Sequence, residues 1–188
     1  ASAHSAHHLR GGFCCNHFNR NVRISYGVNS AVSVSPFNVA RVVASSRPDG
    51  IVHLAGLARP SDAANEPLVA YQSIVTSWAN VLDAVRRTMP RTRVLLVSAC
   101  DVYGGAGRDG TPLTEDTPPQ PLNTFGSLKT TAESVARTFY RNYHLDITIA
   151  RPFHHTGPGQ SDRFFFSAVA RRLATWMPSA GPTLTLPD

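Results

Sequence analysis

Short apolar runs alternate with long amphipathic stretches along most of this chain, and this alternation constrains the fold more than any other feature. The apolar runs occupy residues 51–55, 94–98 and 146–150, and turn residues flank them, as is typical of strands buried in a parallel sheet. The stretches 66–88 and 123–143 repeat apolar residues at steps of three and four, which predicts amphipathic helices. Alternating strands and helices of these lengths predict an α/β fold with a doubly wound parallel sheet.

Weaker patterns predict the remaining elements. Residues 21–26 alternate in polarity as a short strand would. Ser35 followed by Pro36 is a typical helix start, because serine caps the helix and proline fits its first turn, and this helix is expected to end near Ser46. Loops are expected at 104–122 and 154–161, and a last helix at 164–176.

The first 20 residues show no period that would build an element, so we expect a poorly ordered leader. Several candidate metal ligands fall in it. They are His4, His7, His8, Cys14, Cys15 and His17. Their spacing matches no structural zinc pattern, and adjacent cysteines seldom share one ion, so we expect no metal site.

The overall composition excludes several classes of function. The net charge is +6, from 17 arginines and a single lysine, Lys129, against 12 acidic residues. The arginines are scattered, without a basic stripe interleaved with aromatics, which argues against nucleic-acid binding. No apolar run approaches the roughly 18 residues of a membrane span. Three cysteines, two of them adjacent, form no disulfide framework, so a reducing cytoplasmic setting is expected.

One glycine pattern is a decoy. Residues 105–110 read Gly-Ala-Gly-Arg-Asp-Gly and match the G-x-G-x-x-G dinucleotide pattern. That pattern requires a helix directly after it, whose backbone N–H groups meet the pyrophosphate. The residues that follow, Thr-Pro-Leu-Thr-Glu-Asp-Thr-Pro-Pro, cannot begin a helix there, so we interpret this segment as a loop.

In an open parallel sheet, ligands bind at the carboxyl ends of the strands. The informative segments therefore follow the three apolar runs, and two further stretches accompany them. They are His-Leu-Ala-Gly at 53–56, Val-Ser-Ala-Cys-Asp-Val-Tyr-Gly at 97–104, Pro-Leu-Thr-Glu-Asp-Thr-Pro at 112–118, Lys129, and Arg-Pro-Phe-His-His-Thr-Gly-Pro-Gly-Gln at 151–160.

In this order and at these intervals, the segments resemble the extended short-chain dehydrogenase/reductases, the NAD-dependent epimerase/dehydratase family that acts on nucleotide sugars. The nearest variety is the GDP-mannose 4,6-dehydratases and GDP-4-keto-6-deoxymannose reductases. The resemblance covers about residues 35–185. It implies a partial Rossmann-like sheet with flanking helices. Residues 21–160 would form an incomplete NAD(P)-binding domain, and 161–188 would begin a substrate-binding region.

The resemblance also implies roles for individual residues. In this family a tyrosine four residues before a lysine transfers the proton, and the lysine holds the nicotinamide ribose and favours the phenolate. Lys129 falls at the lysine position. The cofactor would be bordered by Leu54, Ala55, Gly56, Val97, Lys129, Pro152, Phe153 and His155, and the sugar by Tyr103 and His154. Packing under the loop is an equal alternative for Tyr103. Asp101 corresponds to the acid of the dehydratases, and a turn or helix cap is an equal alternative for it.

The departures from the family pattern are serious. Phe125 stands at the tyrosine position and has no proton to give, and Ala99 stands at the Ser/Thr position. Ile74 replaces the usual helix asparagine, and Trp78 replaces a smaller residue. Nothing in residues 1–34 has the form of the family's first strand and glycine-rich phosphate turn. We therefore expect little or no hydride transfer at the sugar C4, and weak binding of the NAD or NADP that the family uses.

A second hypothesis is a non-catalytic Rossmann-like module that acts by pairing. The broad apolar face of residues 66–88, with Trp78 added, motivates it. In the resembled family, this helix and the 123–143 helix commonly form a dimer interface. The partners expected are therefore a GDP-sugar, by resemblance, and a second copy of the chain.

Overall fold

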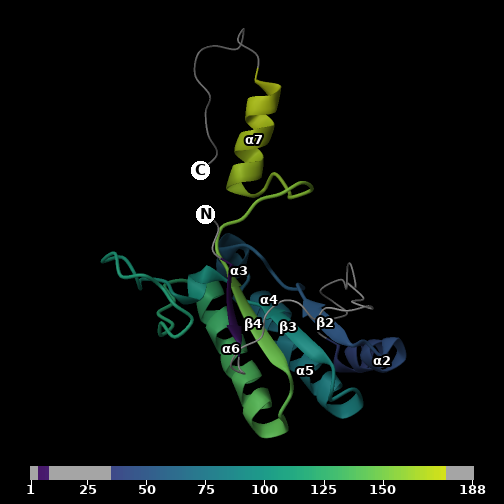
Figure 1. The fold of residues 1–188 in the computed structure, drawn as a ribbon. Helices are drawn as coiled ribbons and strands as arrows, with labels where there is room; N and C mark the ends of the chain where they lie inside the picture. The colour runs from purple at the N-terminus through teal and green to yellow at the C-terminus, as the bar shows by residue number, and fades with distance from the viewer. Residues whose placement is uncertain (1–3, 9–34, 177–188) are drawn as a thin grey trace. The chain divides into compact units, whose positions relative to one another are not determined.

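The computed structural model describes residues 4–8 and 35–176. The chain divides into two compact units, the first ending at Phe153 and the second beginning at His154. The first unit contains all the strands and most of the helices (Figure 1). The predicted strand at 21–26 and most of the predicted leader lie outside the described residues.

Three of the predicted strands form a parallel sheet. They are β2 (Gly50–His53), β3 (Arg93–Val97) and β4 (Ile147–Pro152), and β3 lies between the other two. Val94 pairs with Ile51 on one side and Ile147 on the other. The central strand β3 therefore pairs with both of its neighbours. The carboxyl ends of all three strands lie at one edge of the sheet (Figure 1).

The main helices begin and end close to the expected residues. α2 (Pro36–Ser46) begins as predicted, because Ser35 Oγ accepts a hydrogen bond from Asn38 N at 3.4 Å. The stretch 67–88 is helical throughout, as α4 (Pro67–Tyr71), a π-helical turn (Gln72–Thr76) and α5 (Ser77–Thr88). The longest helix, α6 (Thr124–Tyr143), begins after Asn123.

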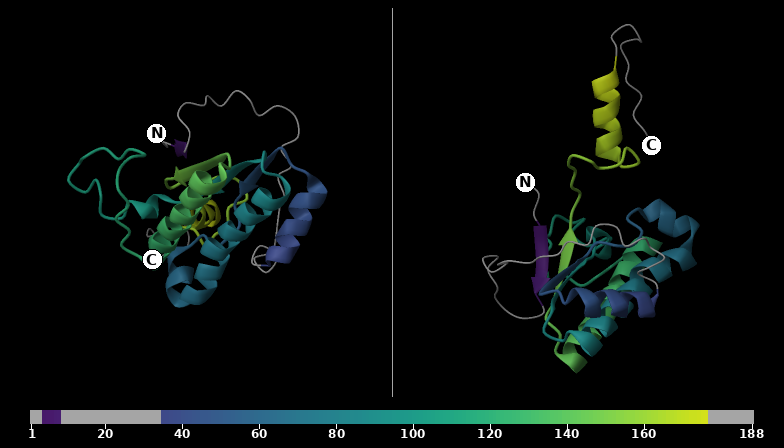
Figure 2. Two further views of the ribbon diagram at one scale, coloured as in Figure 1. Left: turned by 90° about the horizontal axis from the view of Figure 1, so that it is seen from below. Right: turned by 90° about the vertical axis from the view of Figure 1, so that its right-hand side faces the viewer.

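The hydrophobic core lies between the sheet and one layer of helices. The alternate strand residues Val94 and Leu96 of β3, and Ile147 and Ile149 of β4, point into it and are almost fully buried. Its other members come chiefly from α2, α5 and α6: Val39, Val43, Val81, Leu82, Val85, Ala132 and Ala136. The right-hand view of Figure 2 shows the strands on one side of this unit and these helices on the other. The helices described in the first unit thus provide one half of a doubly wound arrangement.

Two elements differ from the expectation. Residues 4–8, within the expected leader, form β1 (His4–His8), which pairs antiparallel with β4 through its backbone. α3 (Pro60–Asn65) was not predicted, because six residues are too few to show a helical period. The only part of the leader that the structure describes is therefore a strand.

The second unit contains α7 (Phe165–Thr175), which confirms the last predicted helix within one residue at each end. Phe165, Phe166 and Leu173 of this helix are more than half exposed. Among the described residues, none of the helices is long and apolar enough to cross a membrane.

Candidate functional site

The segments that directly follow β2, β3 and β4 in the first unit meet at one edge of the sheet. β2 leads into Leu54, Ala55 and Gly56, β3 into residues 98–103, and β4 ends at Pro152, followed by Phe153. The parallel register places His53 beside Leu96, and Val97 beside Ala150. The candidate site is therefore built at the carboxyl edge, where a parallel sheet binds its ligands.

Lys129 is the central cation of this edge. It projects from the buried side of α6, only 6% exposed, and its Nζ donates a hydrogen bond of 2.8 Å to the carbonyl of Val97 at the end of β3. Burial lowers the pKa of Lys129 to about 8, although the charges of Glu133 and Asp101 oppose this shift. The amine is thus engaged by the protein's own backbone.

Two aromatic rings enclose this amine. The Lys129 Nζ lies 5.6 Å from the ring centre of Trp78 and 5.5 Å from that of Phe125, which is within cation–π range. Trp78 is fully buried and Phe125 is 4% exposed. Phe125 therefore lies beside Lys129, where the family's tyrosine would be expected, but presents only a hydrocarbon ring.

A buried histidine and serine form a second polar pair at the same edge. His53, the last residue of β2, lies 2.9 Å through its Nε2 from Ser77 Oγ on α5. Burial, helped by the charge of Lys129, lowers the pKa of His53 to about 4, so the imidazole is neutral at pH 7. A neutral imidazole ring can share one hydrogen bond with the serine hydroxyl. Because both side chains are buried, we interpret this pair as one that stabilises the fold.

Two buried polar atoms nearby lack hydrogen-bond partners within the described residues. They are Trp78 Nε1 and Ser98 Oγ. Buried polar atoms are normally paired, and exceptions concentrate at functional sites or where water binds. Ala99, which follows Ser98, holds no hydroxyl, so the position from which the family's Ser/Thr would reach the sugar is apolar.

Asp101 lies in the short 3-10 helix that follows β3 (Cys100–Val102) and contacts the start of α6. Its Oδ1 accepts a hydrogen bond of 3.0 Å from Asn123 Nδ2, while Asn123 Oδ1 caps the helix by accepting from Gly126 N at 2.7 Å. Gly126 is required here, because a Cβ would lie 2.5 Å from the Asp101 carbonyl. Asn123, and not Asp101, is therefore the residue that caps this helix. The role of Asp101 as an acid remains a prediction.

Tyr103 is buried, with 2% of its surface exposed. The guanidinium carbon of Arg151 lies 4.9 Å from the Tyr103 ring centre, and the Phe153 ring stacks at 6.1 Å. A sugar could reach this phenol only after local opening. The burial of Tyr103 agrees with the alternative that it packs under the loop, and its contact with the sugar remains a prediction.

The cofactor-side residues are placed more openly. Leu54 is 66% exposed, and Gly56 adopts a φ of +130°, with Ser73 O only 3.0 Å from where a Cβ would be.

Cys100 lies in the short 3-10 helix after β3. Burial and the charge of Asp101 raise the pKa of its thiol, which makes the thiol a poor nucleophile.

The remaining predicted residues lie in the second unit. His154 and His155 are exposed and precede a turn in which Thr156 Oγ1 donates to Gln160 Oε1 at 2.7 Å. Their expected contacts with sugar and cofactor stay predictions. Among the described residues, we find no group of three side chains that could hold a metal ion.

Sequence reasoning missed two buried pairs. One is His53 with Ser77, and the other is Arg151 with Glu133, whose side chains are 1% and 2% exposed. A signal existed for the second pair. Arg151 continues the inward alternation of Ile147 and Ile149, and a charge at such a position requires a partner.

Comparison with known proteins extends these observations. A model described as the NAD dependent epimerase/dehydratase family matches residues 16–186. The GDP-6-deoxy-D-mannose reductase of Pseudomonas aeruginosa is 32% identical over 127 residues, which are 68% of this chain and 42% of that protein. The UDP-glucose 4-epimerase 2 of Oryza sativa subsp. japonica is 33% identical over 118 residues, which are 62% of this chain and 28% of the epimerase.

The fold is also similar to that of a solved structure. The structure of RMD from Pseudomonas aeruginosa complexed with NADPH aligns with a TM-score of 0.70 and 30% identity, over 76% of this chain and 48% of that one. The chain thus spans less than half the length of the relatives it matches here.

Proposed function

The chain belongs to the NAD-dependent epimerase/dehydratase family, and from this premise we propose that it is a nucleotide-sugar dehydratase, reductase or epimerase homologue with impaired or absent catalysis. The family's reaction on a nucleotide sugar requires hydride transfer at the sugar C4 and a proton transfer. GDP-sugars are the substrate class that we propose, because the reductase relative is named for one.

One observation supports the proposal most: Lys129 is present, but the tyrosine and the Ser/Thr hydroxyl that would act with it in proton transfer are not. The ring beside it is Phe125, and Ala99 replaces the hydroxyl donor. Neither residue can give or take a proton. Loss of a proton-transfer group typically slows a reaction by about 10²–10⁴-fold.

The residues present fit a dinucleotide poorly at the nicotinamide end. The amine of Lys129 is bonded to the Val97 carbonyl and enclosed by Trp78 and Phe125, so a ribose hydroxyl would have to displace these contacts. The described residues include no glycine-rich turn between a strand and a helix to cradle phosphates. We therefore derive no catalytic step through the cofactor.

Two measurements test the proposal directly. NADPH is titrated into the purified chain and followed by fluorescence, and reduction of GDP-4-keto-6-deoxymannose is assayed with the Pseudomonas aeruginosa reductase as the positive control. We expect no saturable NADPH binding at concentrations that saturate the control, and no turnover above background. A turnover rate comparable with that of the control would overturn the proposal.

The variant Phe125→Tyr tests the geometry without any cofactor. Burial raises the pKa of a phenol at this position, and the Lys129 cation lowers it. The new phenol should therefore titrate at a lower pH in Phe125→Tyr than in Phe125→Tyr/Lys129→Met, as measured by ultraviolet titration with the parent chain as the reference. Equal pKa values in the two variants would mean that residue 125 does not form the family's tyrosine–lysine pair with Lys129.

A second candidate function is pairing through helices. The apolar face of residues 66–88 is divided in the structure. Trp78 and Leu82 are buried in the chain's own core, whereas Leu68 and Tyr71 of the same face are 79% and 47% exposed, and Val69 beside them is 47% exposed. Light scattering of the purified chain tests this candidate, since a well-folded monomer at all concentrations would refute it.

A further inference from the structure

The segment 105–120, called the strap here, is a loop whose two ends meet. Gly105 N donates to Gln120 O at 3.3 Å, and Gln120 N donates to Val102 O at 2.9 Å. The turn at Gly104 has a φ of +51°, and a Cβ there would lie 1.9 Å from Gln120 O. A compact surface loop closed at its base in this way can open as one piece.

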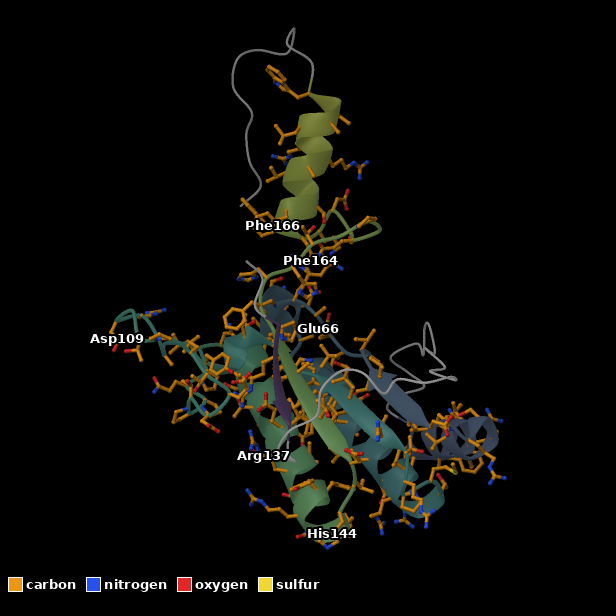
Figure 3. All side chains as sticks on the ribbon, in the orientation of Figure 1. Glu66, Asp109, Arg137, His144, Phe164 and Phe166 are labelled. Atoms are coloured by element: carbon orange, nitrogen blue, oxygen red, sulfur yellow. The ribbon has the colours of Figure 1, made fainter. Side chains whose placement is uncertain are left out.

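The strap has no fully buried side chain, and hydrogen bonds hold it. None of its residues is buried, and Asp109 lies at its outer end (Figure 3). Its internal bonds are short-range, such as Thr111 N to Asp109 Oδ1 at 3.0 Å and Thr114 N to Thr117 Oγ1 at 2.9 Å. A segment with few buried apolar contacts opens at much lower free energy than the core.

One side chain ties the middle of the strap to the sheet. Arg151 Nη1 donates to the carbonyl of Glu115 at 3.4 Å. This hydrogen bond joins the strap's interior to β4, in addition to the backbone bonds at its base.

Arg151 is well fixed for this task. Its Nε and Nη2 bond both oxygens of Glu133 on α6, at 2.9 and 2.6 Å, and both side chains are almost fully buried. Burial alone would lower the pKa of Arg151, but the Glu133 carboxylate outweighs it and raises the pKa, so the guanidinium stays charged. A rigid, charged fork presents its remaining N–H groups in fixed directions.

We propose that the strap is an independently opening element and that Arg151 fastens it to the carboxyl end of β4. Opening releases the Glu115 carbonyl and frees the backbone around Tyr103, whose carbonyl accepts from Ala106 N at 2.9 Å. The device extends beyond the proposed function, because it requires neither cofactor nor sugar.

Hydrogen exchange on the full chain, read by NMR or mass spectrometry, tests this proposal. The double variant Arg151→Met/Glu133→Leu removes the strap contact together with both charges of the buried pair, and such replacements often keep the fold. It also removes the Glu133 charge from the surroundings of Lys129. Exchange of the Gly105 and Gln120 amides should accelerate about tenfold or more, the equivalent of one charge-assisted hydrogen bond. Exchange of the β3 and α6 amides should change much less.

Two more variants sharpen the test. Arg141→Met removes an exposed arginine from the same helix as Glu133 and should leave strap exchange as it is. Arg151→Lys keeps a cation for Glu133 but loses the fork, so the strap amides should still accelerate. Unchanged strap exchange in the double variant would overturn the proposal, as would strap and core amides that accelerate by the same factor. Full protection in Arg151→Lys would also overturn it, since the ion pair alone would then suffice.

Discussion

At the scale of single residues, burial decides the chemistry of the charged and polar groups at the sheet edge. Lys129 and His53 lie in the same surroundings, and burial lowers the pKa of both. The lysine can remain a cation at pH 7 because its lowered pKa of about 8 is still above neutrality. The histidine is neutral there, so it acts as a hydrogen-bonding partner of Ser77 and not as a charge.

This leads to a pH-dependence of stability. The folded pKa of His53 is about 4 and its ordinary value is 6.5, so the unfolded chain binds more protons between these values. The contribution of His53 is therefore full above pH 6.5 and is lost as the pH falls toward 4, by up to about 1.4 kcal/mol per pH unit.

The measurement is urea unfolding at several pH values, with His53→Gln as the comparison. Glutamine keeps a hydrogen-bonding group for Ser77 but does not titrate. The free energy of unfolding of the variant should depend less steeply on pH between 4 and 6.5. Equal slopes for the two proteins would contradict a neutral, buried His53.

At the scale of elements, the caps account for where the helices begin. Asn123 closes the start of α6 through Gly126 N and also donates to Asp101, so one side chain links the helix to the turn after β3. Since α6 carries Phe125, Lys129 and Glu133, this cap positions most of the candidate site.

Asn123→Ala should destabilise the fold by roughly 0.5–2 kcal/mol, because it removes the helix cap. Asn123→Ser is the matched control, since a serine oxygen can still accept from Gly126 N. Chemical denaturation of the three proteins gives the comparison. A loss in the serine variant as large as in the alanine variant would assign the effect to the Asp101 contact instead of the cap.

At the scale of the whole molecule, the core of the first unit joins the helices to one face of the sheet. Leu82 of α5 is fully buried within it, and truncation to alanine should cost about 2–5 kcal/mol, from lost burial and the cavity left behind. Leu54→Ala is the control, because Leu54 is 66% exposed and its change should stay within about 0.5 kcal/mol. Similar losses in the two variants would contradict this core.

The sequence by itself determined the order and kind of the main elements. Periodicity is a local property, so residues 36–46, 66–88 and 123–143 could be predicted as helices, and the three parallel strands followed from their apolar runs. The strand-end motifs likewise located the candidate site, because strand ends of a parallel sheet share one edge.

The tertiary structure decided which side chains meet. Lys129 bonds a carbonyl 32 residues away, and His53 pairs with Ser77 across 24 residues, neither of which leaves a periodic trace in the sequence. The sequence also gives no indication of the backbone pairing of β1 with β4 or of the short helix α3, since neither depends on a repeated pattern of side chains. Contacts between distant residues depend on packing in three dimensions, and only the folded chain specifies it.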